Sequence, residues 1–320
     1  MVSKDVIREN LNSCLTDTSA LRLPGRLEGK VRDIYDLGDK LLLITTDRQS
    51  AFDRVLAEVP FKSQVLNLVS AWWFEQTADI VPNHVLEVPD PSATLARKCK
   101  PFPVEFVVRG YLTGSTSTSA WTLYDNGERN ICGNILPDGM RKNQRFPEPI
   151  ITPTTKSDEH DESITPQGIV EQGLMRAEDW EKASSTALRL FRRGVKLAAE
   201  NGLILVDTKY EMGTDSEGNM LLIDEIHTPD SSRYWLAETY QQRFRAGEKP
   251  DSIDKEFLRL WFRERCDPYN DEKLPTPPDD LVVELSSRYI KLYEMITGRD
   301  FQPATGDPLE RLRRNLSDLI

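Results

Sequence analysis

LILVDTKYEMGTDSEGNMLLIDEIHTPDSSRYW, residues 203–235, contains two apolar runs, LILV and MLLI, and acidic residues follow each of them. Two short apolar runs joined by a polar turn predict an antiparallel hairpin. If the turn is centred on Glu217 and Gly218, Glu211 lies directly opposite Asp224. Like charges at such a cross-strand pair destabilise a sheet. The pattern therefore raises the question of what compensates these two carboxylates.

A divalent cation is one answer. Side chains alternate along a strand, so Asp207, Lys209 and Glu211 share one face. Mg²⁺ is held by one or two carboxylates and completes its shell with waters and substrate phosphates. The residues allow a magnesium site at Glu211 and Asp224, and they equally allow a solvated hairpin whose acids face water. The turn that follows ends in Arg233, which can bind a phosphate or carboxylate through two hydrogen bonds, and this favours the binding site.

A second hairpin is predicted by GRLEGKVRDIYDLGDKLLLITT, residues 25–46, with its turn at Gly38. Gly29 and Lys30 differ from a Walker A loop, because a strand rather than a helix follows them. A hairpin of this kind can instead lie over phosphates, as the glycine-rich loop of protein kinases does. Lys30 and Arg32 would then point at one triphosphate, although a charged surface hairpin is the alternative.

Three further segments carry groups suited to anions. In VVRGYLTGS, Arg109 ends a predicted strand and Ser115 lies in the loop that follows, so a guanidinium and a hydroxyl come together. DRQSAFD contributes Asp53, and TPTTKSDEHDESI contributes Lys156 and Asp161. Each segment has a structural explanation when it is taken alone. Their accumulation in an acidic chain favours a site for an anionic ligand.

The composition narrows the function classes. The chain has 320 residues and a formal net charge of −11, so nucleic acid and anionic membranes are not expected partners. With three histidines, any metal would be a hard cation on carboxylates. The four cysteines form no CxxC pair, and no signal peptide or membrane span is apparent. We therefore expect a cytosolic protein.

Helices and loops complete the expected organisation. Apolar residues recur at helical spacing over 180–198 and 281–296, and a glycine follows each run. The Gly/Ser/Thr-rich stretch 113–119 and the proline-rich stretch 146–153 predict loops. Because the hairpins and helices are segregated along the chain rather than alternating, the α+β class is favoured over a doubly wound sheet.

Taken in chain order, these segments resemble one family, SAICAR synthetase (phosphoribosylaminoimidazole-succinocarboxamide synthase). The matching motifs are GKVRDIYD, DRQSAFD, VEFVVRGYLTGS, HDES, and LILVDTKYEMG followed by DEIHTPDSSRYW. Their order and spacing are similar to the longer form of the enzyme seen in fungi. The resemblance implies an ATP-dependent ligase that joins the carboxylate of 5-amino-1-(5-phosphoribosyl)imidazole-4-carboxylate (CAIR) to the amine of L-aspartate through an acyl phosphate. The products would be SAICAR, ADP and phosphate.

The resemblance also implies roles for individual residues. Mg²⁺ would be bound by Glu211 and Asp224, which form the catalytic group together with Lys209. ATP would be bound by Gly29, Lys30, Arg32 and Asp224. CAIR and aspartate would be bound by Asp53, Arg109, Ser115, Asp161, Lys209, Asp230, Ser232 and Arg233. The partners are then small molecules, and a monomer is expected.

The fold implied by the resemblance has a small β-rich lobe, similar to a kinase N-lobe, packed on a larger ATP-grasp-like α+β lobe, with ATP in the cleft between them. We place the first lobe at 1–105, the catalytic lobe at 106–275, and a helical segment packed on the catalytic lobe at 276–320. The charged, proline-containing region after Asp251 is expected to lie away from the chemistry.

Two other functions remain open at this point. Asp207, Lys209 and Gly213 faintly resemble the DxKxG motif of inositol polyphosphate kinases, so a small-molecule kinase is the main alternative. A kinase would form a stable phosphorylated product without any amine, whereas the ligase requires aspartate. The other alternative is a nucleotide-binding regulatory protein, which would not need the combination of Lys209, Glu211 and Asp224.

Overall fold

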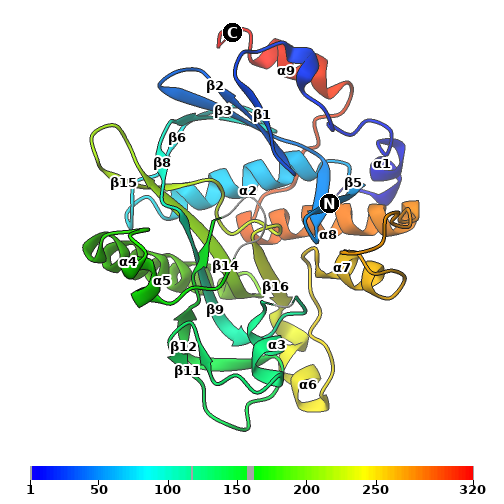
Figure 1. Ribbon diagram of the computed structural model, residues 1–320. Coiled ribbons are helices and arrows are strands. Elements are labelled where there is room, and N and C mark those ends of the chain that lie inside the picture. The colour runs from blue at the N-terminus through cyan, green and yellow to red at the C-terminus, as the bar shows by residue number, and fades with distance from the viewer. Residues whose placement is uncertain (1, 117, 157–161, 320) are drawn as a thin grey trace.

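The computed structural model describes residues 2–116, 118–156 and 162–319, and its first half builds an antiparallel sheet (Figure 1). The strand order in this first sheet is β1-β2-β3-β7-β6. The strands are β1 (Arg26–Glu28), β2 (Arg32–Asp36), β3 (Lys40–Thr45), β6 (Val85–Asp90) and β7 (Ala93–Arg97). The β2–β3 pair is the predicted hairpin with its turn at Gly38, which has a φ of +95°. That prediction is confirmed.

A second sheet is built around one long strand, β14 (Leu203–Thr214), which pairs with four others. Its order is β12-β9-β14-β15, with β13 on β9 and with β8 and β16 on β14. The strands are β8 (Lys100–Pro101), β9 (Val104–Leu112), β12 (Gln144–Ile151), β13 (Thr154–Thr155), β15 (Met220–Ile223) and β16 (Ser232–Leu236). Two small hairpins lie outside both sheets: β4 (Arg48–Ala51) with β5 (Arg54–Glu58), and β10 (Asn130–Ile131) with β11 (Asn134–Ile135).

The proline-rich stretch 146–153 is not the loop that its composition predicts. Most of it belongs to β12, which is an edge strand paired with β9. The register shifts between Arg145 and Ile150, and Pro147 and Pro149 fall within this irregular part. An edge strand tolerates proline at positions where no ladder hydrogen bond is needed, so the prolines locate the irregularity rather than exclude the strand.

The two helices predicted from periodicity are confirmed. They are α5 (Ala177–Glu200), which packs on β14, and α8 (Asp279–Thr297), which packs on α2 (Lys62–Gln76). Gly202 and Gly298 follow them in the left-handed region, with φ of +71° and +67°, as glycine does at helix ends. The remaining helices are α1 (Lys4–Glu9), η1 (Ser19–Leu21), α3 (Ala120–Asp125), α4 (Pro166–Glu171), α6 (Ala237–Ala246), α7 (Glu256–Arg263) and α9 (Pro308–Asn315).

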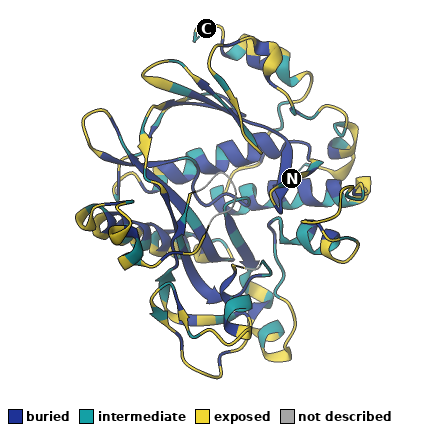
Figure 2. Ribbon diagram, in the orientation of Figure 1, coloured by how far each residue is buried: buried dark blue, intermediate teal, exposed yellow. Residues whose placement is uncertain are grey.

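The main core lies where α2, α5 and α8 meet the second sheet, and Figure 2 shows α2 buried along most of its length. The C-terminal segment reaches both sheets. Its helix α8 packs on α2, whereas Leu312 of α9 and Leu316, which directly follows α9, pack on the first sheet beside Leu42. Because α2 lies within 1–105, both C-terminal helices contact the predicted first lobe, and the division into lobes stays a prediction. In the described ranges, no helix has the length and apolar character needed to cross a membrane.

Candidate active site

The hairpin of β14 and β15 forms, but its predicted register is wrong by one residue. Glu211 pairs with Ile223 rather than with Asp224. The connecting loop, 216–218, has three residues and ends in a glycine with a φ of +84°, which is a favoured geometry for a hairpin of this length. The Asp215 carboxylate accepts two backbone N–H groups from this loop and its end. The loop therefore sets the register, and a two-residue turn does not form.

Asp224 nevertheless enters the site by a different route. It follows β15 with a φ of +65°, a backbone conformation that is uncommon for a non-glycine residue. Its carboxylate accepts a hydrogen bond from Arg32 of β2, whose Nη2 also lies 3.8 Å from Glu225 Oε2. Burial would raise the pKa of Asp224, but Arg32, Lys209 and Lys156 outweigh it and hold that pKa at about 2. Asp224 is therefore an ionised carboxylate at the junction of the two sheets.

Three neighbouring strands place two arginines around one acid. Arg109 on β9 and Arg233 on β16 are both cross-strand partners of Asp207 on β14. Arg233 Nη1 donates to Asp207 Oδ2 at 2.7 Å, and Arg109 Nη1 lies 3.9 Å from the same oxygen. Burial lowers the pKa of Arg109, because Asp207 compensates only part of the lost hydration. Two guanidiniums on one carboxylate leave a net positive charge, which suits an anionic ligand.

Along the same face of the sheet, the predicted group continues with Lys209 and Glu211. Lys209 Nζ lies 2.6 Å from Glu105 Oε1 and 3.1 Å from Glu211 Oε1, and Lys156 donates to Glu211 as well. Burial lowers the pKa of Lys209, but Glu211 and Glu105 raise it well above its ordinary value, so this lysine is a permanent cation. Glu105 was missed from sequence, although its spacing from Arg109 places both on one face of β9.

The loop serine and the β16 arginine meet at a residue that sequence reasoning excluded. Ser115 Oγ donates to Glu256 Oε1 at 2.5 Å, and Glu256 Oε2 lies 4.0 Å from Arg233 Nε and 3.5 Å from Arg259 Nη1. The expectation that the region after Asp251 lies away from the site is therefore wrong. Buried Arg233 Nε, Arg259 Nε and Glu256 Oε2 lack hydrogen-bond partners among the described residues. Buried polar groups normally have such partners, so a ligand is expected here.

Asp230 lies in a second buried group that links distant parts of the chain. Its carboxylate is 3.0 Å from Nζ of the fully buried Lys62 and accepts hydrogen bonds from Tyr289 at 2.6 Å and Gln49 at 3.3 Å. Burial would raise the pKa of Asp230, but Lys255 and Lys62 lower it far below its usual range. Lys62 and Tyr289 were not predicted as site residues, because no local motif marks them.

Gly29 and Lys30 form the turn before β2, and the two cations here, Lys30 and Arg32, contact different acids. Gly29 N donates to Arg32 O at 2.9 Å, and a Cβ at Gly29 would lie 2.7 Å from that oxygen, so this position requires glycine. Lys30 Nζ lies 2.5 Å from Asp53 Oδ1, and both side chains are about half exposed. Arg32 instead contacts Asp224. The turn and the start of β2 thus carry one exposed cation, Lys30, and one partly buried cation, Arg32.

One predicted residue, Ser232, stands apart from this group. Ser232 Oγ donates to Thr208 Oγ1 at 2.7 Å, and because side chains alternate along β14, this contact lies on the opposite face from Asp207. Asp161 lies outside the described residues.

The carboxylates present fit a magnesium ion. Within the part of the chain that the structure describes, no three His, Cys, Asp or Glu side chains converge as a metal cage. Mg²⁺ does not require one, since it is commonly bound through one or two carboxylates with waters and substrate phosphates. Glu211 is buried and Asp224 is partly buried; Lys209 Nζ lies 3.1 Å from Glu211 Oε1 and its charge lowers the pKa of Asp224. Their chemistry matches a hard cation that arrives with a nucleotide.

An ATP-grasp-like α+β fold with this group of buried cations and carboxylates defines an ATP-dependent ligase acting on anionic substrates. The family model described as SAICAR synthetase matches residues 26–276. The chain belongs to the SAICAR synthetase family. The small-molecule kinase alternative is not favoured.

Curated relatives carry the same family name. The chain is 63% identical over 288 residues to the phosphoribosylaminoimidazole-succinocarboxamide synthase of Legionella pneumophila (strain Lens), covering 90% of this chain and 92% of the relative. It is 56% identical over 321 residues to the chloroplastic enzyme of Arabidopsis thaliana, covering 98% of this chain and 78% of the relative.

Solved structures agree on the fold. The SAICAR-synthase from Saccharomyces cerevisiae complexed with SAICAR has a TM-score of 0.78 at 33% identity, over 90% of this chain and 99% of that one. A type-2 SAICAR synthetase in complex with ADP has a TM-score of 0.66 at 26% identity, over 87% of this chain and 99% of that one. The expected likeness to the longer fungal form in particular is not confirmed, because the bacterial and plant relatives above are more similar in sequence.

Proposed function

We propose that the charged group at the junction of the two sheets is the place where this enzyme joins CAIR to L-aspartate with consumption of ATP. The observation that carries the assignment is the group of three arginines, Arg109, Arg233 and Arg259, around the carboxylates of Asp207 and Glu256, with Arg233 Nε buried and without a hydrogen-bond partner among the described residues. A buried positive excess of this kind is costly unless an anion compensates it. We assign the phosphate of CAIR to this position, with Ser115 beside it.

The nucleotide is proposed to lie between the first sheet and the end of β15. Gly29, Lys30 and Arg32 border this region from the first sheet, and Asp224 borders it from the second. Glu211 and Asp224 would hold Mg²⁺, which when bound neutralises phosphate charge and orients the transferred phosphoryl group. Arg32 would then exchange part of its contact with Asp224 for contact with a phosphate.

The chemistry requires little covalent participation by the protein. A carboxylate oxygen of CAIR attacks the γ-phosphorus of ATP, the bond to the bridging oxygen breaks, and ADP leaves. The aspartate amine then attacks the acyl carbon, and phosphate departs with the former carboxylate oxygen while the nitrogen loses a proton. Lys209 is suited to neutralise charge near the transferred group, because its pKa is raised and it remains protonated. The protein thus acts by positioning and charge compensation.

The remaining proposed substrate positions are Asp53, Asp161, Asp230 and Ser232. Asp230 would help to shape the substrate site through its buried contacts with Lys62 and Tyr289. Ser232 would hydrogen-bond Thr208 on the face of the sheet opposite to Asp207. We further propose a monomer in a reducing compartment such as the cytosol. All four cysteines are free thiols, in keeping with such a compartment.

Arg233→Lys tests the CAIR assignment. Lysine keeps the charge but cannot form two parallel hydrogen bonds with a phosphate. We expect the KM for CAIR to rise about tenfold or more, while the KM for ATP changes much less. Arg243→Lys is the matched control, because Arg243 lies on α6 and pairs with Asp251 and Glu248. Equal increases in both KM values would show that Arg233 is not a CAIR ligand.

A further inference from the structure

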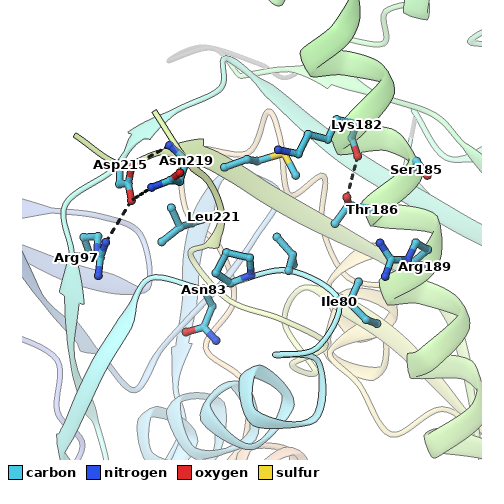
Figure 3. Close-up of a pocket in the computed structure, with 13 residues that line it drawn as sticks. Ile80, Asn83, Arg97, Lys182, Ser185, Thr186, Arg189, Asp215, Asn219 and Leu221 are labelled. Carbon is cyan, nitrogen blue, oxygen red and sulfur yellow. Dashed lines mark hydrogen bonds and ion pairs between the residues drawn. The ribbon is translucent and has the colours of Figure 1, made fainter. Parts of the chain in front are cut away.

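A surface pocket of about 540 Å³ lies between α5, the start of β15 and the segment that precedes β6 (Figure 3). It shares no residue with the proposed active site. Its volume falls within the range of small-molecule sites, which is about 300–1,000 Å³. The pocket is therefore large enough for an organic ligand and much larger than a single inorganic anion requires.

One part of the pocket wall is apolar. Ile80, Val81, Pro82 and Leu221 contribute apolar atoms to the lining, and Leu222 N donates to Pro82 O at 2.9 Å, which fixes the backbone there. Asn83 and Asn219 also line the pocket. The Asn83 amide is already engaged, because its Nδ2 donates to Phe74 O and its Oδ1 accepts from Val85 N, and Asn219 Nδ2 donates to Asp215 and Glu217. A flat ring would therefore find packing here and one amide acceptor, Asn219 Oδ1.

The facing wall carries positive charge. Lys182, Ser185 and Arg189 lie on successive turns of α5, and Figure 3 shows them across the pocket from Arg97 and Asp215. Residues three and four apart on a helix share a face. Among the residues that the structure describes, neither Lys182 nor Arg189 forms an ion pair within 4 Å, although both side chains are exposed.

Glu178 lies four residues before Lys182 on α5, but two other acids near these cations already have partners. Asp79 pairs with Arg193 at 2.8 Å, and Asp179 pairs with Arg176 at 2.7 Å. Within the pocket, Asp215 pairs with Arg97 at 3.2 Å. The Arg97–Asp215 pair is neutral as a unit. The pocket therefore keeps an excess of two positive charges in a chain whose formal net charge is −11.

We propose that this pocket is a binding site for an organic anion with a heterocyclic ring, of the size of a nucleoside monophosphate. The phosphate binds to Lys182, Ser185 and Arg189, and the ring packs on Pro82 and Leu221 with a donor on its edge at Asn219 Oδ1. This site is separate from the proposed active site. Ligands that fill the active site therefore leave it accessible.

The experiment is a calorimetric titration of the protein with AMP in the presence of saturating ADP and SAICAR, which fill the active site. One AMP should bind per chain. Lys182→Ala combined with Arg189→Ala should weaken this binding about tenfold, which corresponds to about 1.4 kcal/mol. Ser185→Trp should abolish it by filling the pocket from an exposed position. Inorganic phosphate should bind far more weakly than AMP, because it lacks the ring.

Arg192→Ala is the matched control. Arg192 is an exposed cation on the same helix, but its partner is Glu148 at 3.4 Å and it does not line the pocket. Its substitution should leave AMP affinity unchanged. The assignment is overturned if the wild-type protein with a filled active site binds no AMP. It is also overturned if the double variant and Ser185→Trp bind AMP as tightly as Arg192→Ala does.

Discussion

At the scale of single residues, Asp224 combines a strained backbone with a buried charge. Its left-handed conformation costs a non-glycine residue about 1 kcal/mol. Arg32, Lys209 and Lys156 keep it ionised despite burial. A strained residue that must also stay charged is typical of functional positions. This combination supports Asp224 as a ligand of the nucleotide's metal.

Asp224→Asn separates the charge from the conformation. Asparagine tolerates the left-handed region, so the fold should persist, but the neutral amide is a poor ligand for Mg²⁺. We expect turnover to fall about a hundredfold or more and to recover partly as Mg²⁺ is raised. Glu217→Gln, an exposed acid in the loop of the same hairpin, is the control and should be neutral. Near-normal activity of Asp224→Asn at low Mg²⁺ would remove the metal assignment.

Sequence patterns identified many of the charged residues of this site, but they did not predict which residues these side chains contact. Strand alternation placed Asp207, Lys209 and Glu211 on one face, because a strand repeats every two residues. The register with Asp224 failed, because it depends on whether two or three residues form the loop. Glu256 was missed altogether, because its contact with Ser115 joins positions 141 residues apart and no local pattern reports such a distance.

At the scale of secondary-structure elements, the sequence predicts those elements best that have one buried and one exposed side. Helix α5 has one exposed side, so its apolar residues repeat at helical spacing. Helix α2 is buried on most sides and carries Lys62 and Asn67 inward, so its sequence shows no amphipathic pattern. Strand β12 was hidden by its prolines. Hydrophobic periodicity alone therefore does not predict elements that are buried on both faces or edge strands with an irregular register.

Helix α8 was predicted as core, and the structure gives it a second role through Tyr289. Its hydroxyl donates to Asp230 at 2.6 Å, and hydrogen bonds to buried charges contribute about 1.5–3 kcal/mol. Tyr289→Phe should lower the free energy of unfolding by about 2 kcal/mol, measured in urea, and raise the KM for CAIR. Tyr293→Phe is the control, because Tyr293 is on the same helix and its ring packs on Phe301, which lies beyond the end of α8. Equal losses in both variants would mean that the Asp230 contact is unimportant.

At the scale of the whole molecule, buried histidine links stability to pH. His227 is fully buried against Tyr210 and Trp73, and a Cβ at Gly194 of α5 would lie 2.5 Å from its ring. Burial lowers the pKa of His227 to about 3, so the folded protein holds it neutral. The unfolded chain, with a pKa near 6.5, binds the proton below that pH. The contribution of neutral His227 to the free energy of unfolding is therefore fully present above pH 6.5 and is lost progressively as the pH falls toward 3.

His227→Gln should flatten this dependence. Between pH 6 and 5 the wild-type free energy of unfolding should fall more steeply than that of the variant, by about 1.2 kcal/mol per pH unit. Urea unfolding of both proteins at several pH values measures the difference in slope. The variant's absolute stability can be lower at every pH without affecting the test. Identical slopes would show that His227 is not held neutral in the fold.

The most direct test of the proposed chemistry follows the oxygen atoms. If Lys209 serves phosphoryl transfer to the CAIR carboxylate, CAIR labelled with heavy oxygen in that carboxylate should deliver one labelled atom to each phosphate released. Lys209→Met should abolish both ADP formation and label transfer while CAIR still binds, which calorimetry can verify. Unlabelled phosphate, label in AMP, or undiminished label transfer in Lys209→Met would contradict a site in which Lys209 stabilises an acyl-phosphate-forming step.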